Sequence, residues 1–526
     1  MERSWRARVT AWLGRPLGRG LTLALAALLC AAPAWLMADS LRTFVLLGDD
    51  FAYLAESRTW PRLIGSLGKP HNAHIVPLFR TWTYTLITIA GRLENLPPVV
   101  GAASYGVLVL VMLTGSHVVA HEAHDQTPGL AAMALLGVTT VMEPATVWYS
   151  AGQPLWAGFC ILAMLAALQK WRSSAGPAWL ILAVAATLAA PAFWSGGYAA
   201  GPVGAVYLWL DGRPRSRRAA ALPIAATAAF VLAVLLAKGP ALFSSRSVPT
   251  LSLTSPAQGV LHSCQAIVEA LVLGNLGHDA ETTASQGALL TILLLGAWSW
   301  SRRPVGRLNA LEVAGATLVA SSLLMVYTFR GNYPYSSLRS LGWYHAMPQV
   351  GFVLFLGGWW IRRFPAEGEV KGLRPVTRGG ACAVVALTAA LLILHVPRAE
   401  RLLAASVGVS TEFVDREATP VRLQALPLAR RRAEAQRRFL ARLDEAERVA
   451  KRLAIGREAI RIAFGRIVGP GLPREAEDLD AADLLNLPGK GSVTDPEEVR
   501  AAIGALLAPP PSVEGSSKPA EKRRLD

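Results

Sequence analysis

Charged residues are scarce in this chain of 526 residues: Asp, Glu, Lys and Arg make up only 17% of it, whereas 52% of its residues are hydrophobic. A soluble protein of this length would need more polar residues to cover so much apolar surface. The mean hydropathy is +0.36, and apolar runs of about 17–22 residues alternate with arginine clusters, which is typical of transmembrane helices. The composition therefore predicts an all-α polytopic membrane protein.

Cysteine is also rare, and several common motifs are missing. Of the four cysteines, three lie inside apolar runs and Cys264 stands alone, so the spacing predicts neither a disulfide framework nor a zinc site. The sequence contains no P-loop, no G-x-G-x-x-G and no G-x-S-x-G motif. His121 and His124 are three residues apart rather than four, unlike the two histidines of H-E-x-x-H. We predict no metal-ligating residues.

The formal net charge of +16 does not indicate a nucleic-acid partner, because the arginines lie mostly in short loops between apolar runs. The positive-inside rule explains that distribution. Five arginines precede the first apolar stretch at 20–38, which we read as a retained first helix with its N-terminus in the cytoplasm. The predicted location is a bacterial-type cytoplasmic (inner) membrane, crossed many times.

Segment 73–92 decides how the chain threads the membrane. If it lies along the outer interface as a juxtamembrane helix, the basic clusters at 170–172 and 213–218 fall in the cytoplasm, as the charge rule requires. About eleven transmembrane helices then remain. They are 20–38, 98–120, 128–146, 153–170, 177–194, 197–210, 220–238, 286–300, 309–328, 345–361 and 379–396.

The chain divides into a transmembrane domain over 1–396 and a C-terminal region outside the membrane. Residues 397–508 form a helical extramembrane region, placed on the extracytoplasmic side, which offers a surface for a protein partner. Residues 509–526 begin with a proline run and are expected to be disordered. The loops predicted on the outer face are 39–97, 239–285 and 329–344.

The most informative polar feature is the acid pair Asp49-Asp50, directly after the first apolar run. Carboxylates at a bilayer surface are costly unless they are solvated or matched, and a carboxylate beside cations can deprotonate a hydroxyl near a phosphorylated donor. The alternative is that one acid caps a following helix. We take Asp49 and Asp50 as candidate catalytic residues. The candidate substrate-binding residues of the same loop are Tyr53, Lys69, His71, His74 and Arg80.

The second candidate region is the outer loop 329–344. Its Arg330 and Arg339 lie where the charge rule disfavours cations, and the guanidinium fork suits phosphate. We add Tyr344 and His345 to the candidate substrate-binding residues. The alternative is an interfacial belt of aromatic side chains.

The layout resembles the GT-C superfamily of integral-membrane glycosyltransferases, which use sugars linked to polyprenyl phosphate. The resemblance rests on the cytoplasmic N-terminus, one helix, and an outer loop that opens with Asp49-Asp50 and places Tyr53 at the aromatic position. The stretch 69–78 leads into a juxtamembrane helix, as in that family. The turn after the third span, 149–153, lacks the second Asp that many relatives carry.

The resemblance implies that Asp49, or else Asp50, is the general base for an acceptor hydroxyl, with inversion at the anomeric carbon. Arg330, Arg339 and Lys69 would bind the phosphate. Membrane lipid and a polyprenyl-phosphate-linked sugar are the implied partners, and a divalent cation is compatible with the pattern although no cofactor is fixed by it. Two alternatives remain: a lipid-linked saccharide transporter or flippase, and a non-catalytic membrane scaffold.

Overall fold

A computed structural model describes residues 2–71, 74–244, 255–276, 309–329, 335, 342–364, 372–406, 426–438 and 440–441. Within these ranges the regular elements are all helices, and β structure is limited to isolated bridges. This confirms the predicted all-helical class for the described part of the chain.

Helices occupy most of the predicted spans. Among the described residues, six stretches are long and apolar enough to cross a membrane, judged by length and composition, which makes this a multi-pass membrane protein. The predicted span 286–300 lies outside the described residues. The helices that coincide with predicted spans are α2 (Arg19–Leu36), α7 (Leu96–Ala123), α10 (Gln153–Ser174), α11 (Pro177–Phe193), α12 (Ala200–Leu210), α14 (Ala221–Ser244), α17 (Ala310–Phe329), α19 (Ala346–Arg363) and α20 (Arg378–Ser406).

The predicted third span, 128–146, is not one continuous helix. Helix α8 ends at Gly137 after 12 residues, and α9 begins only at Glu143. Twelve residues rise about 18 Å, well short of the roughly 30 Å of a bilayer core. In the break, Nδ1 of His395 accepts a hydrogen bond from the Thr140 amide at 3.1 Å. Irregular backbone is tolerated at this depth because protein side chains satisfy it.

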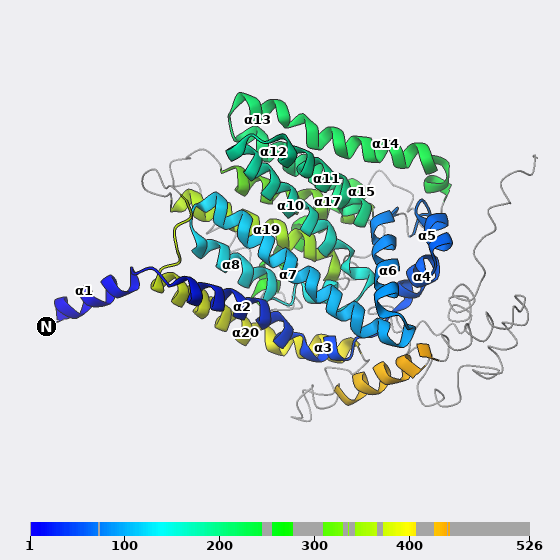
Figure 1. Cartoon of the computed structure of the whole chain (residues 1–526), viewed down its shortest axis with the longest axis horizontal. Coiled ribbons are helices and arrows are strands. Elements are labelled where there is room, and N and C mark those ends of the chain that lie inside the picture. Colours follow the sequence, from blue (N-terminus) through cyan, green and yellow to red (C-terminus); the bar gives the residue numbers. More distant parts are fainter. Residues whose placement is uncertain are drawn as a thin grey trace, which may run out of the picture.

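The small helices that follow α2 gather at one end of the bundle, opposite α1 (Glu2–Leu13). Figure 1 shows α4 (Gly48–Ser57), α5 (Trp60–Ser66) and α6 (Pro77–Ala90) side by side there, with α6 running across the direction of α7. The structure thus contains the helix predicted within 73–92. Its crosswise course is the one expected of a helix that lies along a membrane surface.

Basic loops from distant parts of the sequence meet at the α1 end. The Arg374 amide donates to the His124 carbonyl at 2.9 Å, and Arg172 is paired with Glu122 at 3.3 Å. Arg213 in turn donates to the Arg172 carbonyl at 3.1 Å. This distribution is what the positive-inside rule requires if the α1 end is cytoplasmic; the orientation itself stays a prediction.

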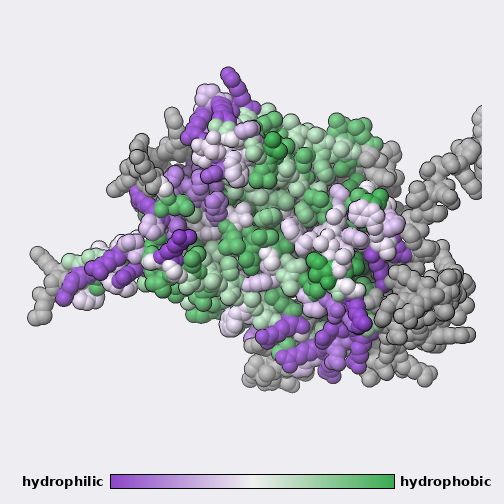
Figure 2. Space-filling model, in the orientation of Figure 1, coloured by the Kyte–Doolittle hydropathy of each residue, from purple (hydrophilic) through white to green (hydrophobic). Residues whose placement is uncertain are grey.

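The bundle packs closely where glycines line a helix crossing. A Cβ atom added at Gly358 of α19 would lie 2.2 Å from the Glu312 amide nitrogen of α17, and one at Gly315 would lie 2.4 Å from the Phe355 nitrogen. Small residues at helix crossings are typical of membrane proteins, because backbones then approach and gain dispersion contacts. Hydrophobic side chains cover the middle of the face seen in Figure 2, with hydrophilic residues toward the α1 end and the lower right.

Candidate active site

The candidate site is built on α4, which begins at Gly48 immediately after the extended residue Leu47. Both acids of the pair fall in its first turn, where a negative charge is favoured by the helix dipole. Helix α4 also contributes Phe51 and Leu54, which are almost fully buried, to a small apolar cluster shared with α6. This cluster fixes the helix that carries the acid pair.

The two adjacent aspartates have different surroundings, and Asp50 is the buried one. It has no exposed surface. Its Oδ2 accepts a hydrogen bond from the Leu47 amide at 2.8 Å, and its Oδ1 accepts one from the Ser150 amide at 2.8 Å. The first bond is half of a capping box, so the capping alternative describes Asp50 well. The second ties α4 to the turn before α10.

Asp49 is the more exposed of the two acids. Its side chain is 45% exposed, and its Oδ1 lies 3.6 Å from Nε2 of His71. The imidazole of His71 in turn packs against the Tyr53 ring, with the ring centroids 4.5 Å apart. An acceptor hydroxyl from solvent or membrane can therefore approach the carboxylate of Asp49, whereas both oxygens of Asp50 are engaged inside the protein.

Tyr53 is a buried connector between α4 and α10. Only 1% of it is exposed, and its hydroxyl accepts a hydrogen bond from the Gln153 side-chain amide at 2.8 Å. Burial raises the pKa of this hydroxyl, so it stays neutral. Tyr53 therefore positions His71, and its hydroxyl faces Gln153 and not the surface.

A compact ion-pair group joins α4, the loop after α5, and α6. Glu56 accepts from Nη2 of Arg80 at 2.8 Å and lies 2.7 Å from Nζ of Lys69. Burial alone would raise the pKa of Glu56, but the charges and hydrogen bonds of Arg80 and Lys69 outweigh it and lower that pKa. Arg80, predicted to bind substrate, has no exposed surface, so its role here is to hold α6 against α4. Lys69, 61% exposed, is the cation that a ligand can reach.

His74 and Tyr344 meet the turn that follows α11. Nδ1 of His74 lies 2.7 Å from the Ser195 hydroxyl. The Tyr344 ring stacks on the neighbouring Trp194, with centroids 6.4 Å apart, and is 6% exposed. The structure thus brings both predicted residues to one turn, with most of Tyr344 inside the protein.

His345 lies inside the bundle, beside Tyr327 of α17. Its Nε2 is 3.0 Å from the Tyr327 hydroxyl. Only 4% of the residue is exposed, so the imidazole is enclosed by the protein. Arg330 and Arg339, which were predicted to bind phosphate, lie outside the described residues.

A segment from the C-terminal region packs beside the site. Gln436, on a helix over residues 426–438 drawn in orange in Figure 1, pairs with the backbone of Leu46. Its Oε1 accepts from the Leu46 amide at 2.7 Å, and its Nε2 donates to the Leu46 carbonyl at 2.8 Å. Leu440 is buried against the same apolar cluster as Phe44. The described part of the predicted extramembrane region therefore contacts the stretch that leads into Asp49.

Replacing Gln436 with Ala should loosen this contact. The substitution leaves the buried amide and carbonyl of Leu46 without partners, at about 1–3 kcal/mol for each such group. We expect hydrogen exchange of the Leu46 amide and of helix 426–438 to accelerate by tenfold or more. Glu434→Ala, on the exposed side of the same helix, is the control and should exchange like the wild type. Equal exchange in the two variants would contradict this docking.

The burial of Asp50 predicts a pH-dependent stability. Burial raises its pKa from 3.8 to about 7, with the hydrogen bonds from Leu47 and Ser150 opposing the shift. A carboxyl that holds its proton more tightly when folded contributes stability below its unfolded pKa, and that contribution is lost as pH rises through the folded pKa. Between about pH 4 and pH 7, the unfolding free energy of the wild type should therefore fall relative to Asp50→Asn. If the unfolding free energies of the two proteins changed in parallel with pH, the effect of burial on Asp50 would be refuted.

The described residues do not form a divalent-cation site beside the acid pair. Across the described ranges, no group of three or more His, Cys, Asp or Glu side chains is arranged to hold a metal ion. His71 is the residue beside Asp49 whose side chain is of a metal-binding type, and the Asp50 oxygens already accept backbone hydrogen bonds. Hard cations require several oxygen ligands.

Several site residues escaped prediction from the sequence. Ser150, Gln153, Ser195 and Gln436 each bond to a predicted residue or to the stretch before it, from positions far along the chain. Gln153 had one local signal, since it is a polar residue at the start of an apolar run. The others stand in turns or in a polar helix, where such residues are common.

No family model matches this chain, and neither does any curated protein.

Proposed function

We propose that this protein is a membrane glycosyltransferase that moves a sugar from a polyprenyl-phosphate donor to a hydroxyl of an envelope glycan, lipid or protein. The reaction would take place at the membrane face that holds α4–α6. The observation that carries the proposal is the division of the acid pair: Asp50 is anchored inside the protein, and Asp49 is held at the surface beside His71. A rigid layer that presents one carboxylate beside cations suits a general base.

In the proposed reaction, the acceptor oxygen attacks the anomeric carbon while its proton passes to Oδ1 or Oδ2 of Asp49. The bond between that carbon and the phosphate oxygen breaks, and the electron pair leaves with the polyprenyl phosphate. The leaving group is already an anion of low basicity, so the step needs stabilising cations more than a strong general acid. Lys69, which is 61% exposed and paired with Glu56, is one phosphate ligand that we propose, and Arg330 and Arg339 are the others.

The test is a cell that lacks this chain, complemented with wild type, Asp49→Asn or Asp50→Asn, followed by profiling of envelope glycans. We expect the wild type to restore a glycan that the deletion loses, and Asp49→Asn to fail at an equal level of protein. If both variants restore the wild-type profile, the catalytic proposal fails. If the deletion alters the envelope glycans but neither Asp49→Asn nor Asp50→Asn does, the result would instead support the scaffold alternative.

The transporter alternative has one observation in its favour, a polar network inside the bundle. The side-chain amides of Asn275 and Gln349 exchange two hydrogen bonds of 2.7 Å, and His395 links the Asn275 carbonyl to Thr140. A transporter needs polar groups at depth. These groups bond to one another, however, which favours a structural role. Translocation of a lipid-linked saccharide by proteoliposomes of the Asp49→Asn protein would support the transporter instead.

A further inference from the structure

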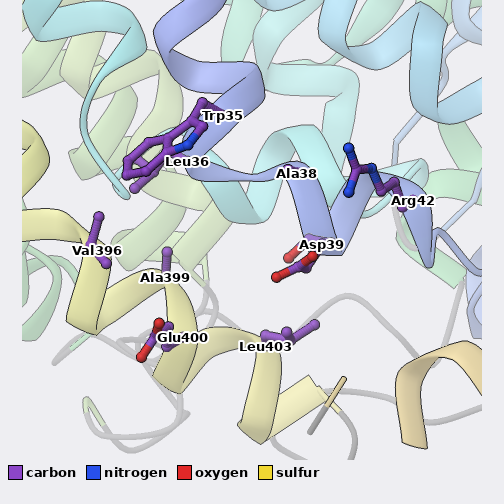
Figure 3. Close-up of a pocket in the computed structure, with 10 residues that line it drawn as sticks. Trp35, Leu36, Ala38, Asp39, Arg42, Val396, Ala399, Glu400 and Leu403 are labelled. Atoms are coloured by element: carbon purple, nitrogen blue, oxygen red, sulfur yellow. The ribbon is translucent and has the colours of Figure 1, made fainter. Parts of the chain in front are cut away.

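A pocket of about 240 Å³ opens between the end of α2, the short helix α3 (Ala38–Arg42), and α20. Figure 3 shows Trp35 and Leu36 on one side, Val396 and Glu400 across from them on α20, and Asp39 between the two walls. The volume lies below the range of about 300–1,000 Å³ that is usual for drug-sized ligands. It suits a small polar group such as a lipid headgroup.

The polar lining combines charges of both signs. Asp39 and Glu400 contribute carboxylates from separate helices, and Arg42 adds a guanidinium at the rim. Two carboxylates can accept the three hydrogens of a primary ammonium. A guanidinium donates to phosphate in the same way. The complementary ligand therefore carries a primary amine and a phosphate a few bonds apart.

The pocket lies where a lipid headgroup would meet the protein. It forms at the ends of α2 and α20, two of the helices long and apolar enough to cross a membrane. Trp35 is 63% exposed beside it, as Trp is at membrane interfaces. Along the same two helices, the apolar side chains of Leu28 and Ile393 are 59% and 75% exposed. Acyl chains could follow these surfaces while the headgroup enters the pocket.

From these observations we infer that this pocket binds the headgroup of a phospholipid with a primary amine, such as phosphatidylethanolamine. Asp39 and Glu400 hold the ammonium, Arg42 holds the phosphate, and Trp35 and Leu36 contact the first carbons of the acyl chains. This site lies outside the α4–α6 layer and does not depend on the proposed transferase reaction.

The inference is tested with the full-length, delipidated protein in detergent and native mass spectrometry of lipid binding. The lipids form a series in which methyl groups replace the ammonium hydrogens one at a time. The series consists of phosphatidylethanolamine, its N-methyl and N,N-dimethyl forms, and phosphatidylcholine. We expect affinity to fall along that series, by about tenfold overall, since tenfold corresponds to about 1.4 kcal/mol. Phosphatidylglycerol, which has no amine, should bind as weakly as phosphatidylcholine. Equal affinity across the series would overturn the inference.

Variants locate the binding in the pocket. The double substitution Asp39→Asn/Glu400→Gln should weaken the binding of phosphatidylethanolamine about tenfold. It should also remove the differences in affinity among the methylated lipids. Glu94→Gln is the matched control, because Glu94 is paired with Arg92 in the turn before α7, outside the pocket. Unchanged affinity in the double variant would place the lipid elsewhere, against the inference. If that variant does not fold, the wild-type series decides alone.

A soluble competitor distinguishes a lipid from a free phosphoamine. Millimolar O-phosphoethanolamine should leave bound phosphatidylethanolamine in place, because it lacks the chains that contact Trp35 and Leu36. Displacement at concentrations comparable to the lipid would mean that the pocket recognises a soluble ligand, and it would overturn the assignment to a lipid.

Discussion

Asp49→Asn is expected to lower the rate of sugar transfer by about 10²–10⁴-fold, the usual contribution of a general base. The substitution keeps the size of the side chain and removes its ability to take up a proton. The Asp49 side chain is 45% exposed and lies 3.6 Å from His71, so an amide of the same size fits the position. The measurement is single-turnover transfer from a polyprenyl-phosphate-linked sugar by the purified protein.

Two comparisons make that result specific. Glu94→Gln removes an acid on the same side of the bundle, in an exposed ion pair with Arg92, and should retain wild-type transfer. Asp50→Asn should act first on stability, since both oxygens of Asp50 hold backbone amides. Wild-type transfer by Asp49→Asn, with transfer abolished in a folded Asp50→Asn protein, would show that we assigned the base to the wrong carboxylate.

Breaking the Glu56–Arg80 pair should have the largest effect on stability. Glu56→Gln removes the carboxylate that Nε and Nη2 of Arg80 contact at 3.0 and 2.8 Å, and Arg80 has no exposed surface. Removing one partner of a buried pair costs about 3–5 kcal/mol, because the remaining charge stays buried without compensation. We expect a corresponding drop in the free energy of unfolding in mixed micelles, with faster hydrogen exchange in α6.

An exposed pair and a double variant control this experiment. Arg92→Gln breaks the Arg92–Glu94 pair, whose side chains are 59% and 32% exposed, and should cost no more than about 1 kcal/mol. Glu56→Gln/Arg80→Met should recover part of the loss, because it removes both buried charges. A cost for Glu56→Gln no larger than that for Arg92→Gln would show that the pair does not stabilise the α4–α6 layer.

The positions of most helices could be predicted from the local sequence pattern. The break after α8 could not, because it involves a tertiary contact. Apolar runs and their flanking arginines placed α7, α10 and the start of α20 within a few residues, because hydrophobicity and charge act on each segment separately. The break after α8 was missed. It depends on His395, which lies 255 residues beyond Thr140 in sequence, and no local pattern reveals such a partner.

The sequence by itself determined that this is a helical membrane protein and that an acid pair follows its first apolar helix. Only the tertiary structure decided that Asp50 is buried while Asp49 stays accessible, because Ser150, 100 residues away, donates to the former. It also decided that Gln436, 390 residues from Leu46, packs beside the site. Composition and periodicity are properties of single segments, whereas burial and hydrogen bonding depend on which segments meet.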